Sequence, residues 1–142
     1  MSFLNELFGS KPHYPPLEPG VPAAEKLNKV RNTIETLASS VKEPMEIVPA
    51  GENAYVYIGK PPKHFGMAWV EKGVVKNFKM LAEEKGLTST ELTDLQEKLR
   101  VVYERHQSEP RYSTKLAGRE IVVIQSPGLE EDVKGIISQA TH

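Results

Sequence analysis

The sequence contains no cysteine among its 142 residues. Disulfide bonds, thiolate metal sites and cysteine nucleophiles are therefore excluded, and redox chemistry gives no information about the compartment. Neither sign of charge is in excess, because 18 basic and 19 acidic residues leave a net charge of −1. The chain has no global positive field that would attract nucleic acid or anionic membranes, so such binding would need a local patch.

Long hydrophobic runs are missing as well. No apolar run approaches the roughly 20 residues that a membrane-spanning helix needs. The N-terminal sequence MSFLNELFGSK lacks the basic start, the apolar stretch and the cleavage site of a secretory signal. We therefore expect a cytoplasmic protein that is not an integral membrane protein.

The composition is that of a folded domain, with 39% apolar and 26% charged residues. A chain of this length buries one hydrophobic core and is too short for two ordinary domains. Five of the eleven prolines fall within residues 10–22, which favours extended chain there. We predict an amphipathic turn and an extended proline-rich arm over residues 1–21, followed by a single α+β domain over residues 22–142.

Hydrophobic periodicity predicts the elements of that domain. Apolar residues spaced three and four apart predict a helix that begins at Pro22 and is stopped by Pro44. Later helices are expected from Val74 to near Gly86, from a capping box of Thr88 and Glu91 to near Ser108, and from residues 126–128 onward. The segments with strand composition are Met45–Val48, Ala54–Ile58, Gly66–Glu71 and Ile121–Ile124, and a loop is expected at residues 111–112.

The resulting order, α-β-β-β-α-α-β-α, predicts an α+β fold. We expect a two-layer sandwich in which helices pack on a short, mainly antiparallel sheet of about four strands. The segment GKPPKHF at residues 59–65 is too rich in proline for a tight hairpin turn, so a true loop is expected there. The helical stripes at 23–41 and 92–106 last under three heptads, which favours core packing, with a helix-mediated dimer as the alternative.

The loop between the second and third strands is the most unusual segment. Residues 55–80 hold five lysines and one glutamate, whereas residues 81–110 hold seven acids and four bases. We predict a contact surface for a partner, or for an acidic or anionic ligand, formed by Tyr57, Lys60, Lys63, His64, Phe65 and Trp69. The alternative is that the lysines are ordinary solvated residues and the aromatic side chains belong to the core.

A second predicted contact surface lies at the N-terminus. At helical spacing, one face of this segment collects Phe3, Leu4, Leu7 and Phe8. Such a face is too bulky to leave in water, so we expect it to dock on the protein's own body or on a partner chain. A membrane surface is less favoured, because the segment is short and has a single lysine nearby.

Arrangements typical of catalysis are mostly absent from the sequence. The four histidines never occur at metal-ligand spacing, and neither a GxSxG elbow nor a glycine-rich phosphate loop is present. His106 continues a helical stripe and is interpreted as a partly buried, hydrogen-bonded side chain. Residues 79–100 have the outline of a helix-turn-helix, but Glu91, Asp94 and Glu97 would repel DNA phosphates.

These observations predict a non-catalytic protein-interaction module, an accessory subunit or regulator that needs no metal or cofactor and is able to self-associate. The alternative is a small-molecule sensor or small enzyme with a pocket near Tyr57, His64 and Trp69. Nucleic-acid binding through residues 79–100 is the least favoured function.

Overall fold

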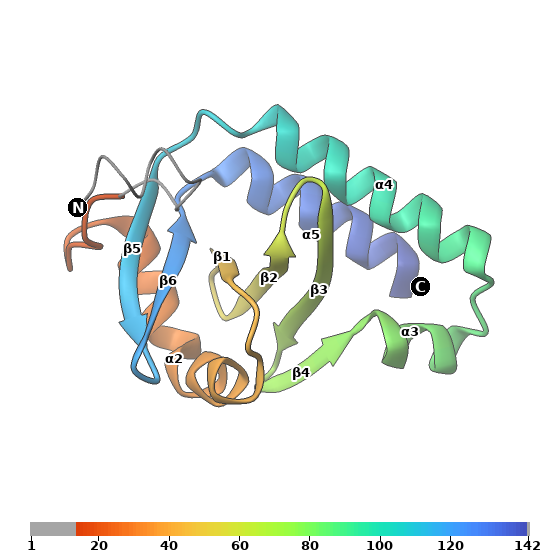
Figure 1. The fold of residues 1–142 in the computed structure, drawn as a ribbon, viewed down its shortest axis with the longest axis horizontal. Coiled ribbons are helices and arrows are strands. Elements are labelled where there is room, and N and C mark those ends of the chain that lie inside the picture. The colour runs from red at the N-terminus through yellow and green to blue at the C-terminus, as the bar shows by residue number, and fades with distance from the viewer. Residues whose placement is uncertain (1–13, 142) are drawn as a thin grey trace.

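Four helices surround a six-stranded sheet in the computed structural model, which describes residues 14–141 (Figure 1). None of these helices is long and apolar enough to cross a membrane. The elements in chain order are α2 (Pro22–Ser40), β1 (Met45–Ala50), β2 (Asn53–Lys60), β3 (His64–Glu71), β4 (Val74–Asn77), α3 (Phe78–Lys85), α4 (Ser89–Arg105), β5 (Arg111–Leu116), β6 (Arg119–Ile124) and α5 (Pro127–Thr141).

The sheet has the strand order β4-β3-β2-β1-β6-β5, in which only the pair of β1 and β6 is parallel. The α+β class is confirmed, but the expectation of about four strands is wrong. Val74–Asn77 is strand β4 and not the beginning of a helix, and the loop expected at residues 111–112 is the start of strand β5.

Two tight turns explain both differences. At residues 72–73 the φ angles are 52° and 77°, and at residues 117–118 they are 53° and 74°. Consecutive positive φ angles give the twist that a two-residue β-hairpin needs. The first turn folds β4 back on β3, and the second folds β6 back on β5. The spacing of apolar residues gives no information about this turn geometry. Strand β4 and the start of strand β5 were therefore not predicted.

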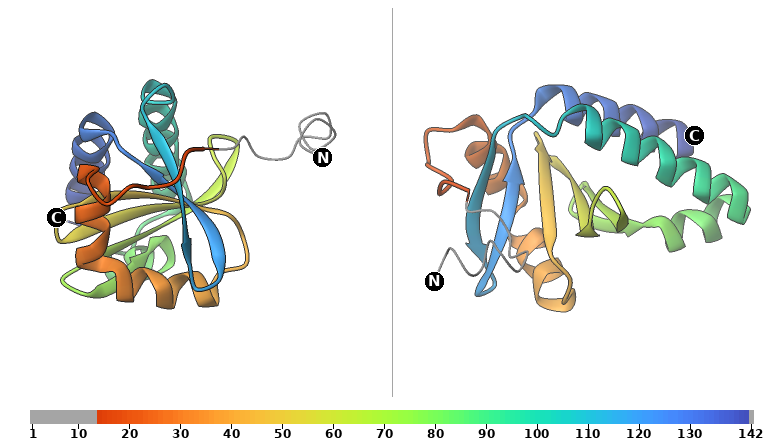
Figure 2. Two further views of the ribbon diagram at one scale, coloured as in Figure 1. Left: turned by 90° about the vertical axis from the view of Figure 1, so that its left-hand side faces the viewer. Right: turned by 45° about the horizontal axis from the view of Figure 1, so that its top comes forward.

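Helices cover both faces of the sheet, so the expected two-layer sandwich is wrong and the fold has three layers (Figure 2). Along β2, alternate residues face opposite sides. Val56 packs in the cluster that includes Ile34 of α2, whereas Tyr57 packs in the cluster that includes Leu99 of α4 and Val133 of α5. The third layer follows because β2 is apolar on both of its faces.

The connection between β2 and β3 is also shorter than expected. Three residues, 61–63, join the two strands, because Lys60 already pairs with His64. The residue before Lys60 makes this close pairing possible: Gly59 has a φ of 115°, and an added Cβ would lie 2.9 Å from the backbone oxygen of His64. Only glycine adopts this backbone conformation without strain.

The predicted helix ends are largely confirmed. Pro22 is the first residue of α2, and Gly86, with a φ of 66°, ends α3. Thr88 and Glu91 form the expected capping box at the start of α4, which ends at Arg105, slightly before the expected position. At α5, the hydroxyl of Ser126 accepts a hydrogen bond from the backbone N–H of Leu129 at 3.1 Å.

The described part of the N-terminal arm lies along the outer edge of β5. Pro16 forms a parallel bridge with Ser113. The backbone N–H of Ser113 donates to the oxygen of Pro15, and the N–H of Leu17 donates to the oxygen of Ser113, each at 2.9 Å. The predicted docking residues Phe3, Leu4, Leu7 and Phe8 lie outside the described residues.

Candidate functional site

An open groove of about 410 Å³ lies between the β2–β3 hairpin and α4. One wall is the hairpin tip and the beginning of β3, and the other is a single face of α4 at helical spacing. The lining residues are Pro62, Lys63, His64 and Phe65 from the hairpin, and Thr93, Gln96, Glu97 and Arg100 from α4.

Buried and partly buried contacts at the groove hold the hairpin in position against α4. The side-chain amide of Gln96 donates to the backbone oxygen of Phe65 at 2.7 Å, and the hydroxyl of Tyr57 donates to the backbone oxygen of Leu99 at 2.9 Å. The rings of Tyr57 and Phe65 lie 5.2 Å apart. The two walls therefore present their side chains at a defined separation.

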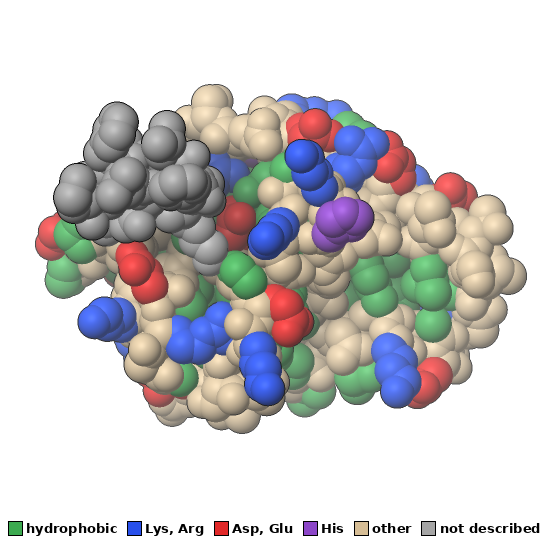
Figure 3. Space-filling view, in the orientation of Figure 1, with side chains coloured by type: hydrophobic (Ala, Val, Ile, Leu, Met, Phe, Trp, Pro, Cys, Tyr) green, Lys and Arg blue, Asp and Glu red, His purple; other side chains and the backbone are tan. Residues whose placement is uncertain are grey.

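The charges of the groove are unevenly paired. Glu97 accepts hydrogen bonds from Arg100, whose guanidinium also donates to Glu104 at 2.7 Å, and the hydrogen bond with Glu97 raises the pKa of Arg100. By contrast, no carboxylate among residues 14–141 lies within 4.0 Å of Lys60 or Lys63. Figure 3 shows Lys and Arg side chains beside a histidine on this face of the molecule.

The tyrosines under the groove are strongly shielded from water. Burial raises the pKa of Tyr57 far above its usual value, and the nearby Tyr103 and Glu46 raise it further. Burial likewise raises the pKa of Tyr103, whose hydroxyl donates to Glu46 at 2.7 Å. Both hydroxyls therefore remain protonated donors at neutral pH and act as structural contacts.

The residues predicted from sequence divide into two groups. Lys63, His64 and Phe65 line the groove, and the exposed Lys60 stands beside it. Tyr57 and Trp69 are fully buried in the core below and do not line it. The Nε1 atom of Trp69 is buried without a hydrogen-bond partner among the described residues.

Sequence reasoning missed the α4 wall. Thr93, Gln96, Glu97 and Arg100 share one face of the helix, and that pattern is visible in the sequence. Nothing in the pattern shows that this polar face lies against the β2–β3 hairpin and not against bulk solvent. Which segment packs against a helix face depends on the tertiary structure, and the order of elements along the chain does not reveal it.

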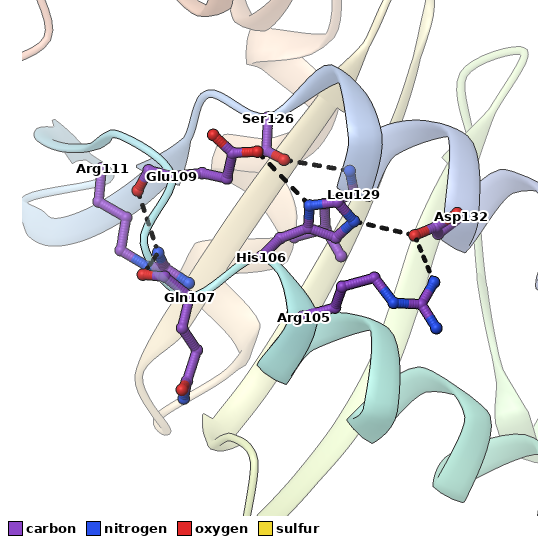
Figure 4. A network of polar contacts seen from close by, with 8 residues as sticks. All are labelled: Arg105, His106, Gln107, Glu109, Arg111, Ser126, Leu129 and Asp132. Carbon is purple, nitrogen blue, oxygen red and sulfur yellow. Dashed lines mark hydrogen bonds and ion pairs between the residues drawn. The ribbon is translucent and has the colours of Figure 1, made fainter.

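A second polar cluster joins the end of α4 to the start of α5 (Figure 4). His106 Nε2 lies 2.9 Å from Asp132 Oδ2, and His106 Nδ1 lies 3.5 Å from Glu109 Oε1. Arg105 also contacts Asp132, at 3.2 Å. The interpretation of His106 as a partly buried, hydrogen-bonded side chain is confirmed.

This cluster is not arranged as a catalytic base. Both ring nitrogens of His106 face carboxylates, so neither is directed at a nucleophile or a substrate. The ring also packs on Gly128, where an added Cβ would lie 2.5 Å from His106 Cε1. His106 therefore serves to join the two helices. Within residues 14–141, no group of three His, Asp or Glu side chains is placed to hold a metal ion.

Comparison with protein-family models, with curated proteins and with solved structures finds no match to this chain. Fold and ancestry therefore supply no function, and any function has to be inferred from the geometry and charge of the groove.

Proposed function

We propose that the protein is a non-catalytic interaction module, an accessory subunit or regulator, that binds an acidic segment of a partner protein between the β2–β3 hairpin and α4. The observation that supports this most is that the exposed cation Lys63 and the exposed imidazole of His64 meet the apolar side chain of Pro62 in one groove, with the largely buried Phe65 at its base. Cations attract an acidic partner over a distance, and apolar contact adds affinity that salt does not screen. The proposal keeps the cytoplasmic location that the sequence predicts.

The pairing of charges supports an acidic occupant. Arg100 already holds Glu97, so this acid does not compete for the lysines. A carboxylate that arrives at Lys60 or Lys63 meets a solvated ammonium group and displaces no described ion pair. Because the lysines are exposed, each contact contributes modestly and is sensitive to salt, so an acidic segment with several carboxylates is needed for useful affinity.

The shape of the groove favours a protein segment over a small molecule. Sites for small molecules bury most of the ligand surface in a concave, mainly apolar pocket. Here the side chains of Lys60, Lys63 and His64 are exposed, and the groove is open to solvent along the hairpin. An extended segment that spans the groove suits this geometry.

The test uses a fluorescein-labelled peptide in which glutamate and leucine alternate, with a matched peptide that has glutamine in place of glutamate. The wild-type chain is expected to bind the glutamate peptide more tightly, with affinity that falls as salt rises. The variant Lys60→Glu/Lys63→Glu should bind at least about tenfold more weakly, which corresponds to about 1.4 kcal/mol. Fluorescence anisotropy measures both effects.

The matched control replaces two exposed lysines elsewhere. Lys29 lies on α2 and Lys115 on β5, so Lys29→Glu/Lys115→Glu changes the net charge equally and should retain the wild-type affinity. Equal weakening in both double variants, or equal binding of the two peptides, overturns the proposal. Displacement of the peptide by free glutarate at a similar concentration would instead identify a small-anion site.

A further inference from the structure

A second groove lies on the opposite flank of α4 from the candidate functional site. It has a volume of about 450 Å³ and is formed where the α3–α4 connection, the first half of α4 and the end of α5 meet. Its α4 residues are Glu91, Asp94, Leu95 and Lys98, none of which lines the first groove. The two surfaces can therefore be changed independently.

The floor of this groove is apolar. It is formed by Leu87, Leu95, Ile136 and Ala140, of which Leu95 belongs to the core and the others pack partly exposed against it. Covering these side chains would stabilise a complex through the hydrophobic effect.

The rim carries Lys85 at the end of α3, and its charges along α4 have a specific order. Two acids, Glu91 and Asp94, precede one base, Lys98, by one to two helical turns on the same flank. Asp94 and Lys98 lie within 4.0 Å of no oppositely charged side chain among residues 14–141. Glu91 accepts a hydrogen bond from the backbone N–H of Thr88 at 3.1 Å.

An order of acids followed by a base is self-complementary in an antiparallel pair. When two copies of α4 are related by a two-fold axis near Leu95, the acids of one copy face Lys98 of the other, and the reverse holds at the second contact. A partner of one charge sign would be repelled by one half of the rim. We propose that a second copy of this chain occupies the groove, with α4 packed antiparallel against α4 of its partner.

The apolar stripe of α4 is already used within the chain, since Leu95, Leu99 and Val102 belong to its own core. The proposed dimer therefore uses the neighbouring flank and is not the coiled coil that the stripe alone would suggest. The proposal is independent of the acidic-segment site, because Lys63 and His64 stand on the other side of α4.

Sedimentation velocity over a wide range of concentration tests this proposal on the full chain. The wild type is expected to form a reversible dimer. Lys98→Glu places only acids on the α4 part of the rim and should weaken dimerisation at least about tenfold. Asp94→Lys adds a base to the rim and should also weaken dimerisation. An equimolar mixture of the two variants should associate again, because each copy then carries the charge that the other lacks.

Circular dichroism confirms that each variant is folded, and Lys63→Glu is the control that should dimerise as the wild type does. A wild type that stays monomeric at every concentration overturns the proposal. The same conclusion follows if Lys98→Glu dimerises normally, or if the mixture of Lys98→Glu and Asp94→Lys fails to associate.

Discussion

The backbone conformation of Gly59 sets the position of the hairpin, and with it the positions of Lys60, Lys63 and His64. Its φ is 115°, and a Cβ added at this position would lie 2.9 Å from the His64 oxygen, which leaves no room for a side chain. Gly59→Ala should therefore cost about 2 kcal/mol of unfolding free energy, through backbone strain and displacement of the hairpin. Urea denaturation measures this loss.

Gly66 offers the matched control, since it lies in the same hairpin and an added Cβ there meets nothing within 4 Å. Gly66→Ala should change the unfolding free energy by no more than about 0.5 kcal/mol. Similar losses in the two variants would show that the close approach at Gly59 does not determine the position of the hairpin.

The buried tyrosines predict a loss of stability in alkaline solution. Burial, with smaller contributions from Glu71 and other acids, raises the pKa of Tyr55 from 10.0 to about 12. Burial raises the pKa values of Tyr57 and Tyr103 as well. The unfolded chain loses these protons at lower pH than the folded chain, so the unfolding free energy is unaffected below pH 10 and falls as pH rises above it.

Urea denaturation at a series of pH values measures this fall, and tyrosinate absorbance reports ionisation of the tyrosines. Tyr57→Phe removes one of the shifted groups, so its stability should fall less steeply above pH 10 than that of the wild type. Ionisation of the tyrosines before unfolding, without loss of stability, would contradict the burial of these hydroxyls.

At the scale of elements, α2 depends on a side chain from a distant strand. Arg119, at the start of β6, donates to the backbone oxygens of Ala38, Val41 and Glu43 at and beyond the end of the helix. These carbonyls lack helical partners, and a cation there also interacts favourably with the helix dipole. Arg119 thus ties the end of α2 to the sheet.

Removing this contact should destabilise the protein. Arg119→Ala is expected to lower the unfolding free energy by about 2 kcal/mol, because charge-assisted hydrogen bonds to the end of α2 are lost. Thermal or urea denaturation measures it, with Lys115→Ala on the exposed side of the neighbouring strand as the control. Equal stability of the two variants would show that Arg119 does not support α2.

Elements were predictable from sequence where one local signal was sufficient. The periodic stripe after Pro22 and the capping box at Thr88 and Glu91 located α2 and α4, because helix signals are contained within a few turns of chain. Strand β4 was missed because Val74, Val75 and Phe78 also fit a helical spacing. The segment is a strand because the chain turns at Lys72, which takes a positive φ that a lysine rarely adopts.

At the scale of the whole molecule, three of the eight residues that line the candidate site were predictable. Lys63, His64 and Phe65 were singled out by the composition of their segment, and the structure places them in one groove. The α4 wall depends on how the helix packs across the sheet, which composition does not encode. Trp69 was predicted to lie on the contact surface because it is near a basic segment, but it is fully buried.

The two grooves on opposite flanks of α4 give the molecule two separate candidate contact surfaces. One flank, through Gln96 and Arg100, faces the basic hairpin, and the other, through Asp94 and Lys98, carries the proposed contact with a second copy. A dimer of this kind would present two hairpin grooves. A partner with two acidic segments would then bind more tightly than one segment alone, provided that its linker spans the grooves.

The central claim is that an acidic segment binds between the hairpin and α4, and an NMR titration tests it most directly. The ¹⁵N-labelled chain is titrated with the glutamate–leucine peptide, and backbone and side-chain amide shifts are followed. We expect the largest shifts at residues 60–66 and 93–100, including the Gln96 side-chain amide that donates to Phe65. Two results would contradict the claim. The shifts could centre on another surface, or the glutamate peptide could cause no shifts and so behave in the same way as the glutamine peptide.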